Sequence, residues 1–117
     1  MKFVLPLPPN LGNARMHWRT RQAKRKAYNG NVMIALSMAS QLPNGPPLPK
    51  ARIAATLYVH QRMDADNLFA RLKWPLDCLV AVGWLEDDGP DHLEWAGMPS
   101  QVVDRKSPRV EIELEAA

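Results

Sequence analysis

The sequence predicts an α+β fold in which one mixed β-sheet is covered by two helices, in a single domain of residues 1–117. Its 117 residues match the usual size of one domain, and 46% hydrophobic residues is ordinary for a globular protein with a buried core. In two segments the apolar residues have helical spacing. In other segments apolar and polar residues alternate, as they do in half-buried strands. Seven of the eleven prolines lie in two clusters, at residues 6–9 and 43–49, which indicates structured turns.

The N-terminal part is expected to form a short strand followed by a helix. The stretch KFVLPLPP is typical of a strand that runs into a proline-rich turn. The next predicted helix extends to about Gln41, although Gly30 disfavours one unbroken helix. Helical spacing places four residues on one stripe: Tyr28, Val32, Leu36 and Ala39. The stretch PNGPPLPK then predicts a loop.

A strand and a second helix follow this loop. In ARIAATLYVH, residues 51–60, apolar side chains recur at every second position, which predicts a half-buried strand. From Asp66 to about Val82 the spacing is helical, and Asp66 is a suitable capping residue. Pro75 removes a backbone hydrogen bond and is expected to kink this helix. Gly83 is well placed to end it.

The C-terminal part is expected to contribute a turn and two strands. WLEDDGPD has the composition of a turn. HLEWAGMPSQVVD predicts one strand, and RVEIELE predicts another with Val110, Ile112 and Leu114 facing inward. The expected element order is therefore β-α-β-α-β-β.

Charge is distributed very unevenly along the chain. Residues 1–63 carry ten Lys and Arg and no Asp or Glu, whereas residues 64–117 carry five Lys and Arg and twelve Asp and Glu. Such asymmetry indicates a polyanionic partner such as DNA, although the charges could instead intermix and cancel in the fold. The predicted DNA contacts are Arg15, Arg19, Arg21, Lys24, Arg25, Lys26 and Arg62.

Asp64 and Asp66 are the first acidic residues of the chain and lie between a predicted strand and a predicted helix. If residues 62–66 are extended, both carboxylates lie on one face, where a cation would relieve their repulsion. Oxygen ligands without nearby Cys or His favour Mg²⁺ or Mn²⁺. The turn with Glu86, Asp87 and Asp88 could supply a third ligand. Alternatively, all these acids are ordinary turn and capping residues.

Lys73 falls on the same side of the predicted second helix as Asp66. At 100° per residue, Lys73 and Asp77 project close to Asp66 around a straight helix. A cation there could stabilise charge that develops during phosphodiester cleavage. The alternative is a surface ion pair between Lys73 and Asp77, four residues apart.

The remaining reactive side chains point to no other chemistry. His17, His60 and His92 lack metal-ligand spacing, and Cys78 lies among apolar residues as a buried small hydrophobe. Trp18 or Tyr28 could stack on an unpaired base, but core packing is the alternative for both. With one cysteine and no long apolar run, we expect a cytoplasmic protein without a membrane partner.

Four motifs in order resemble the RusA-type Holliday-junction resolvases, small endonucleases of bacteriophages and prophages, over nearly the whole chain. LPLPPNLGNARMHWR resembles the family's Leu-Pro-x-Pro-Pro start with a following Asn and aromatic–Arg pair, here Asn13 and Trp18–Arg19. DADN at 64–67 resembles its Asp-x-Asp-Asn motif. KWPLDCLVAVGWLEDD and VDRKSPRVEIELE resemble its Lys-bearing helix and its closing strand.

The resemblance implies a homodimer that makes paired symmetric nicks in four-way DNA junctions with Mg²⁺, in a bacterial or phage-infected cell. It implies that Asp64, Asp66 and Asp88 bind the metal. Lys73 matches the catalytic Lys when counted back from Asp77, and Arg71 is the alternative because the spacing after Asn67 is longer than in the family. Two other hypotheses stay open: a non-catalytic junction- or DNA-binding protein, and a protein whose acids are structural and whose basic half binds another partner.

Overall fold

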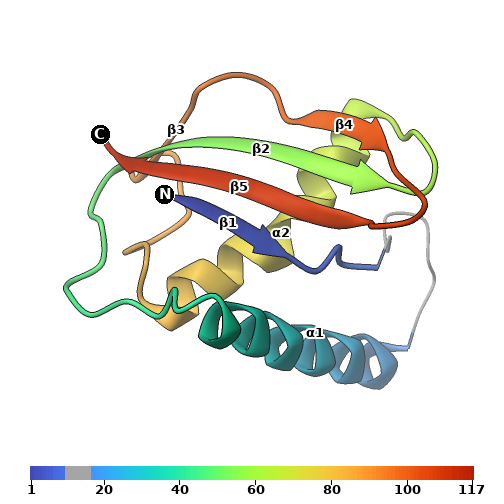
Figure 1. Ribbon diagram of the computed structural model, residues 1–117, viewed down its shortest axis with the longest axis horizontal. Helices are drawn as coiled ribbons and strands as arrows, with labels where there is room; N and C mark the ends of the chain where they lie inside the picture. The colour runs from blue at the N-terminus through green and yellow to red at the C-terminus, as the bar shows by residue number, and fades with distance from the viewer. Residues whose placement is uncertain (10–16) are drawn as a thin grey trace.

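The sheet is built around β2 (Ala51–Val59), which has hydrogen-bonded neighbours on both edges in the computed structural model of residues 1–9 and 17–117. On one edge, β5 (Arg109–Ala116) runs antiparallel to β2, and β1 (Lys2–Leu5) runs antiparallel to β5. On the other edge, β3 (Leu93–Trp95) and β4 (Ser100–Val103) pair in parallel with successive parts of β2. The sheet is therefore mixed, as the sequence predicts (Figure 1).

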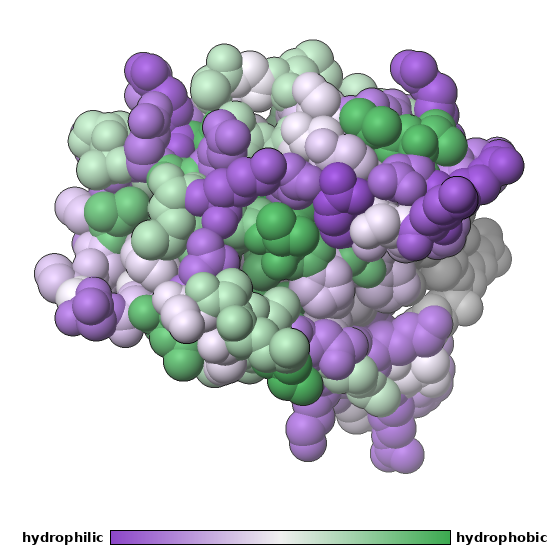
Figure 2. Space-filling model, in the orientation of Figure 1, coloured by the Kyte–Doolittle hydropathy of each residue, from purple (hydrophilic) through white to green (hydrophobic). Residues whose placement is uncertain are grey.

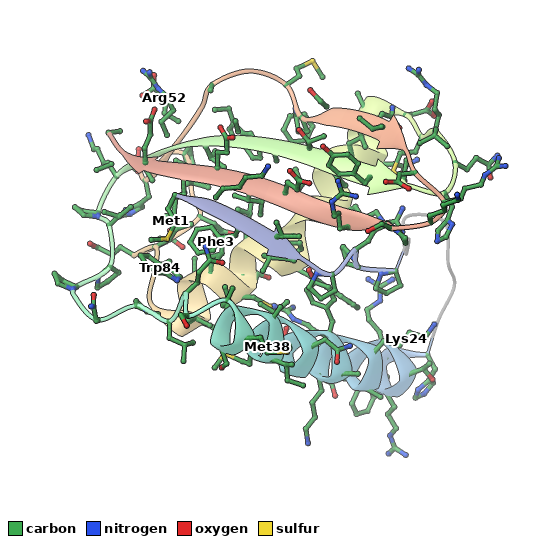
Figure 3. The ribbon with its side chains drawn as sticks, in the orientation of Figure 1. Met1, Phe3, Lys24, Met38, Arg52 and Trp84 are labelled. Atoms are coloured by element: carbon green, nitrogen blue, oxygen red, sulfur yellow. The ribbon has the colours of Figure 1, made fainter. Side chains whose placement is uncertain are left out.

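Two helices cover one face of this sheet, α1 (Trp18–Met38) and α2 (Ala65–Val82), and in Figure 1 α2 passes behind the strands. The alternating residues of β2 and β5 bury one side chain in two against these helices. Phe3 of β1 joins this core and packs edge-on against Trp84, with ring centroids 5.3 Å apart (Figure 3). The predicted α+β fold is thus confirmed.

The opposite face of the sheet carries charged side chains (Figure 2). The Arg109 guanidinium lies 3.7 Å above the centre of the Tyr58 ring and pairs with Glu111 at 2.7 Å. Glu111 also pairs with the Lys2 ammonium at 2.6 Å. These contacts tie β1, β2 and β5 together across their exposed side.

Three details of the predicted elements are corrected. The single strand expected within residues 92–104 is two short strands, β3 and β4, separated by residues 96–99, so the order is β-α-β-α-β-β-β. Gly30 does not interrupt α1, because the helix is anchored by buried Tyr28 and Val32 on either side of it. The N-cap residue of α2 is Asp64, whereas Asp66 lies in its first turn.

The ends of α2 are set by backbone conformation. Asp64 is extended, with φ −71° and ψ 159°, and its side chain makes no capping hydrogen bond. The helix runs through Pro75 and ends at Gly83, as expected, where φ is +106°. Within the described ranges 1–9 and 17–117, neither helix is long and apolar enough to cross a membrane.

We expect Gly83→Ala to lower the free energy of unfolding by roughly 1–2 kcal/mol, because alanine is strained at positive φ. A Cβ atom there would lie 3.7 Å from Pro43 Cγ, an ordinary contact, so the cost is conformational. The control is Gly30→Ala, where a Cβ meets nothing within 4 Å and should stabilise the helix by roughly 0.5–1 kcal/mol. Urea unfolding of both variants measures the two effects, and equal shifts would contradict the prediction.

Candidate nucleic-acid interface and carboxylate site

The first half of α1 is exposed on all its sides. Every residue from Trp18 to Ala27 is exposed, and the buried stripe of the helix begins only at Tyr28. Figure 3 shows Lys24 at this end of the helix, away from Met38. We call residues 18–27 the basic arm; it carries Arg19, Arg21, Lys24, Arg25 and Lys26. Arg15, another predicted DNA contact, lies outside the described residues, as does Asn13.

The start of the basic arm combines two sources of positive potential. His17 is the N-cap residue, and its Nδ1 accepts a hydrogen bond from the backbone N–H of Arg19 at 3.2 Å. The first turn of α1 contains no acidic residue, so Arg19 and Arg21 lie near the positive end of the helix dipole without a compensating carboxylate. This arrangement is unfavourable for the isolated helix, and an anion bound there would relieve it.

One cation of the arm is engaged within the protein. Arg25 pairs with Asp77 of α2 at 2.7 Å and so joins the two helices. Within the part of the chain that the structure describes, the other cations of the arm make no ion pair, and neither does Arg62, which is exposed between β2 and α2. The arm therefore presents free positive charge at its surface.

The predicted carboxylate pair, Asp64 and Asp66, lies at the start of α2, after the short connection from β2. Asp64 and Asp66 are both exposed. Residues 65 and 66 are already helical, so residues 62–66 are not the single extended segment on which the predicted shared face depended. The Asp64 and Asp66 side chains therefore do not share one face of a strand. The negative charge of Asp66 in the first turn interacts favourably with the positive end of the helix dipole and stabilises α2.

Gln101 of β4 fixes the residue that precedes Asp64. Its side-chain oxygen accepts from the backbone N–H of Met63 at 2.9 Å, and its amide nitrogen donates to the Met63 carbonyl at 2.8 Å. The Gln101 side chain thus makes the pair of hydrogen bonds that a neighbouring strand would make, and it holds the segment before α2 against the sheet. Sequence reasoning missed Gln101, because the two residues lie 38 positions apart.

Lys73 joins two carboxylates on different segments. Its ammonium group lies 3.2 Å from Asp77, one turn further along α2, and 3.2 Å from Asp88 in the turn after the helix. Partial burial alone would raise the pKa of Asp88, but the hydrogen bond and charge of Lys73 outweigh it and lower that pKa. The hydrogen bonds to Asp88 and Asp77 raise the pKa of Lys73. The alternative pairing of Lys73 with Asp77 is therefore present, and the contact of Lys73 with Asp88 comes in addition to it.

Arg71, the alternative cation, lies elsewhere. Its Nε donates to the Pro8 carbonyl at 2.7 Å, and burial lowers its pKa. Arg71 thus ties α2 to the segment after β1 and has a structural partner. Lys73 is the cation that contacts Asp88.

The three predicted metal ligands do not form a ready metal site. Among residues 1–9 and 17–117, no group of three or more His, Cys, Asp or Glu side chains is arranged to hold a metal ion. The Lys73 ammonium already pairs with one oxygen of the Asp88 carboxylate, Oδ2, at 3.2 Å. Asp64, Asp66 and Asp88 therefore do not form a three-ligand site in this arrangement, and Mg²⁺ binding stays a prediction.

Comparison with known proteins adds no assignment. No family model matches the chain, and no curated protein matches it either.

We expect Gln101→Leu to loosen the entrance to α2, because it leaves two part-buried backbone groups of Met63 without partners. The loss should be about 1–3 kcal/mol of unfolding free energy, together with faster hydrogen exchange at the Met63 amide. Gln61→Leu, at an exposed position two residues before Met63, is the control. Unchanged exchange at Met63 in the Gln101 variant would refute the role of this side chain.

Lys73→Met should raise the pKa of Asp88 toward its ordinary value. Since the folded-state pKa of Asp88 lies below that of the unfolded chain, the pair stabilises the protein above the unfolded value, and this contribution is lost as pH falls through the folded value. The stability difference between wild type and variant should thus be present at neutral pH and shrink below about pH 4. NMR titration of the Asp88 carboxyl and urea unfolding measure both effects. Lys26→Met is the control, and a difference that persists in acid would contradict this account.

Proposed function

We propose that this chain binds DNA through the basic arm and acts as a structure-specific endonuclease on branched DNA. The observation that carries the proposal is the exposure of residues 18–27 around the whole circumference of α1, with free cations at a helix start that lacks acids. A surface of this kind is costly for stability and is suited to a polyanion.

Binding follows from the shape and charge of the arm. An α-helix that stands clear of the core can enter the major groove, which is wide enough to admit one. Arg19, Arg21, Lys24 and Lys26 then neutralise phosphates and release their counterions. The helix N-terminus adds backbone N–H groups and its positive dipole end. Arg62, at the end of β2, extends the basic surface toward the carboxylate pair at Asp64 and Asp66.

Cleavage is proposed from the resemblance to RusA-type resolvases, together with the accessible carboxylates of Asp64 and Asp66 and the contact of Lys73 with Asp88. The same proposal includes a homodimer, because a four-way junction has two-fold symmetry that a two-fold dimer would match. Mg²⁺ would be the cofactor, with Mn²⁺ as its substitute.

A second candidate is a DNA-binding protein of the same fold without catalytic activity. It is favoured by the carboxylates that do not converge and by the engagement of Asp88 with Lys73. Binding would be the same in both cases, so only a cleavage assay separates them.

The double variant Lys24→Ala, Lys26→Ala should bind DNA more weakly, and the slope of log K against log salt should fall by about 2, because each lost phosphate contact contributes about 0.9. The matched control is Lys50→Ala, Arg52→Ala, which removes the same charge outside the arm. Fluorescence anisotropy over a salt series measures both slopes. Equal slopes for the two double variants would refute a specific role for the arm.

A labelled four-way junction and a matched linear duplex, each with Mg²⁺ or EDTA, test the endonuclease. We expect paired nicks in the junction with Mg²⁺, none with EDTA and none in the duplex. Asp66→Asn should abolish cleavage but keep or strengthen junction binding, since it removes a negative charge, while Asp91→Asn in an exposed turn should cut normally. Tight junction binding without cleavage in Mg²⁺ or Mn²⁺ would favour the non-catalytic candidate.

A further inference from the structure

Phe69 is an exposed aromatic residue of α2 that lies beside β3. Its side chain is 41% exposed. It is held by Trp95 of β3, with ring centroids 5.4 Å apart and an interplanar angle of 77°. This edge-to-face contact fixes the orientation of the Phe69 ring without covering it. Trp95 itself packs against the core, so the pair has a rigid base.

The position of Phe69 along α2 places it between the charged residues described above. It lies three residues after Asp66 and four before Lys73, spacings at which side chains are neighbours on a helix. Asp66 is exposed, and Lys73 is joined to Asp88. One side of α2 therefore presents a carboxylate, an aromatic ring and an ammonium–carboxylate pair in sequence.

We propose that Phe69 is a stacking platform for an unpaired nucleobase, so that this side of α2 receives bases that leave the duplex at a branch point. The inference rests on the proposed function. Stacking of a base on an aromatic ring does not depend on base identity, because every base has a π-face. A ring that is already oriented by Trp95 loses little freedom when a base binds.

The charges around Phe69 favour a nucleobase over a phosphate group and over a protein partner. In the absence of a bound metal ion, the carboxylates of Asp66 and Asp88 repel a phosphate. The DNA backbone would then run along the basic arm while the base, whose N–H groups can donate to a carboxylate, turns toward Phe69. The buried core of a protein interface is depleted of charged residues, whereas Phe69 has Asp66 on one side and Lys73 on the other. A protein partner fits this surface less well.

The test compares wild type with Phe69→Leu, Phe69→Trp and Val103→Ala. Phe69→Leu keeps an apolar side chain without a π-face, Phe69→Trp keeps an aromatic face, and Val103 is a comparably exposed apolar residue, 47% exposed, on β4. Each protein is titrated, in EDTA, with a single-stranded oligonucleotide and with a duplex of the same length. A 2-aminopurine at the centre of the single strand reports stacking by its fluorescence quenching.

We expect Phe69→Leu to lose roughly 5- to 100-fold in single-strand affinity and to lose the quenching, while its duplex affinity changes less than twofold. Phe69→Trp and Val103→Ala should behave like wild type. An unchanged ratio of single-strand to duplex affinity in Phe69→Leu would overturn the proposal. The proposal would also be overturned if Phe69→Leu changed the sedimentation coefficient of the protein but not the ratio of single-strand to duplex affinity. That result would indicate a protein interface at Phe69 instead. If wild type bound duplex through the arm but did not quench the probe, the stacking site alone would be refuted, whereas no binding to either DNA would refute the proposed function as well.

Discussion

The structure depends on the hydrogen bonding of β2 along both of its edges. β5 pairs with one edge over almost the whole strand, while β3 and β4 share the other edge. Because β3 and β4 run parallel to β2, the chain must return to the starting end of the sheet, and α2 provides that crossover. This requirement places the start of α2 directly after β2. The topology of the sheet therefore sets the positions of Asp64 and Asp66 at the junction of β2 and α2. Gln101 of β4 holds this junction through its two hydrogen bonds to the Met63 backbone.

The uneven charge of the sequence is partly resolved in space. Lys2, Arg25 and Arg52 of the acid-free half pair with Glu111, Asp77 and Glu94 of the acidic half, so intermixing is correct for these residues. The basic arm is different, because most of its cations lie beyond the reach of the acids in the described structure. A net charge of +3 thus hides a local concentration of positive charge at one end of one helix.

Periodicity was sufficient to predict the two helices and the longer strands, because burial of one face imposes its spacing on the sequence. The division of residues 92–104 into β3 and β4 could not be predicted, since it reflects how two short segments align with β2, a tertiary contact. Helical spacing predicted the pairing of Lys73 with Asp77, whereas its contact with Asp88 joins the helix to the turn after it and follows from no local pattern. The link from Gln101 to Met63 and the pairing of Phe69 with Trp95 join residues distant in sequence, and no local pattern signals them.

The interruption between β3 and β4, at residues 96–99, has a consequence for how the protein behaves in solution. An outer strand exposes unpaired backbone groups that can recruit a strand from another molecule, and long flat edges are the most prone to do so. Here one edge is divided into segments of three and four residues, and the other is the four-residue β1, whose Lys2 carbonyl accepts from the Gln41 side chain and whose chain continues into prolines. Among residues 1–9 and 17–117, neither edge of the sheet offers a long template for aggregation. Such edges favour recognition of a second copy of the chain through side chains on a face of the molecule, where association can be specific and reversible.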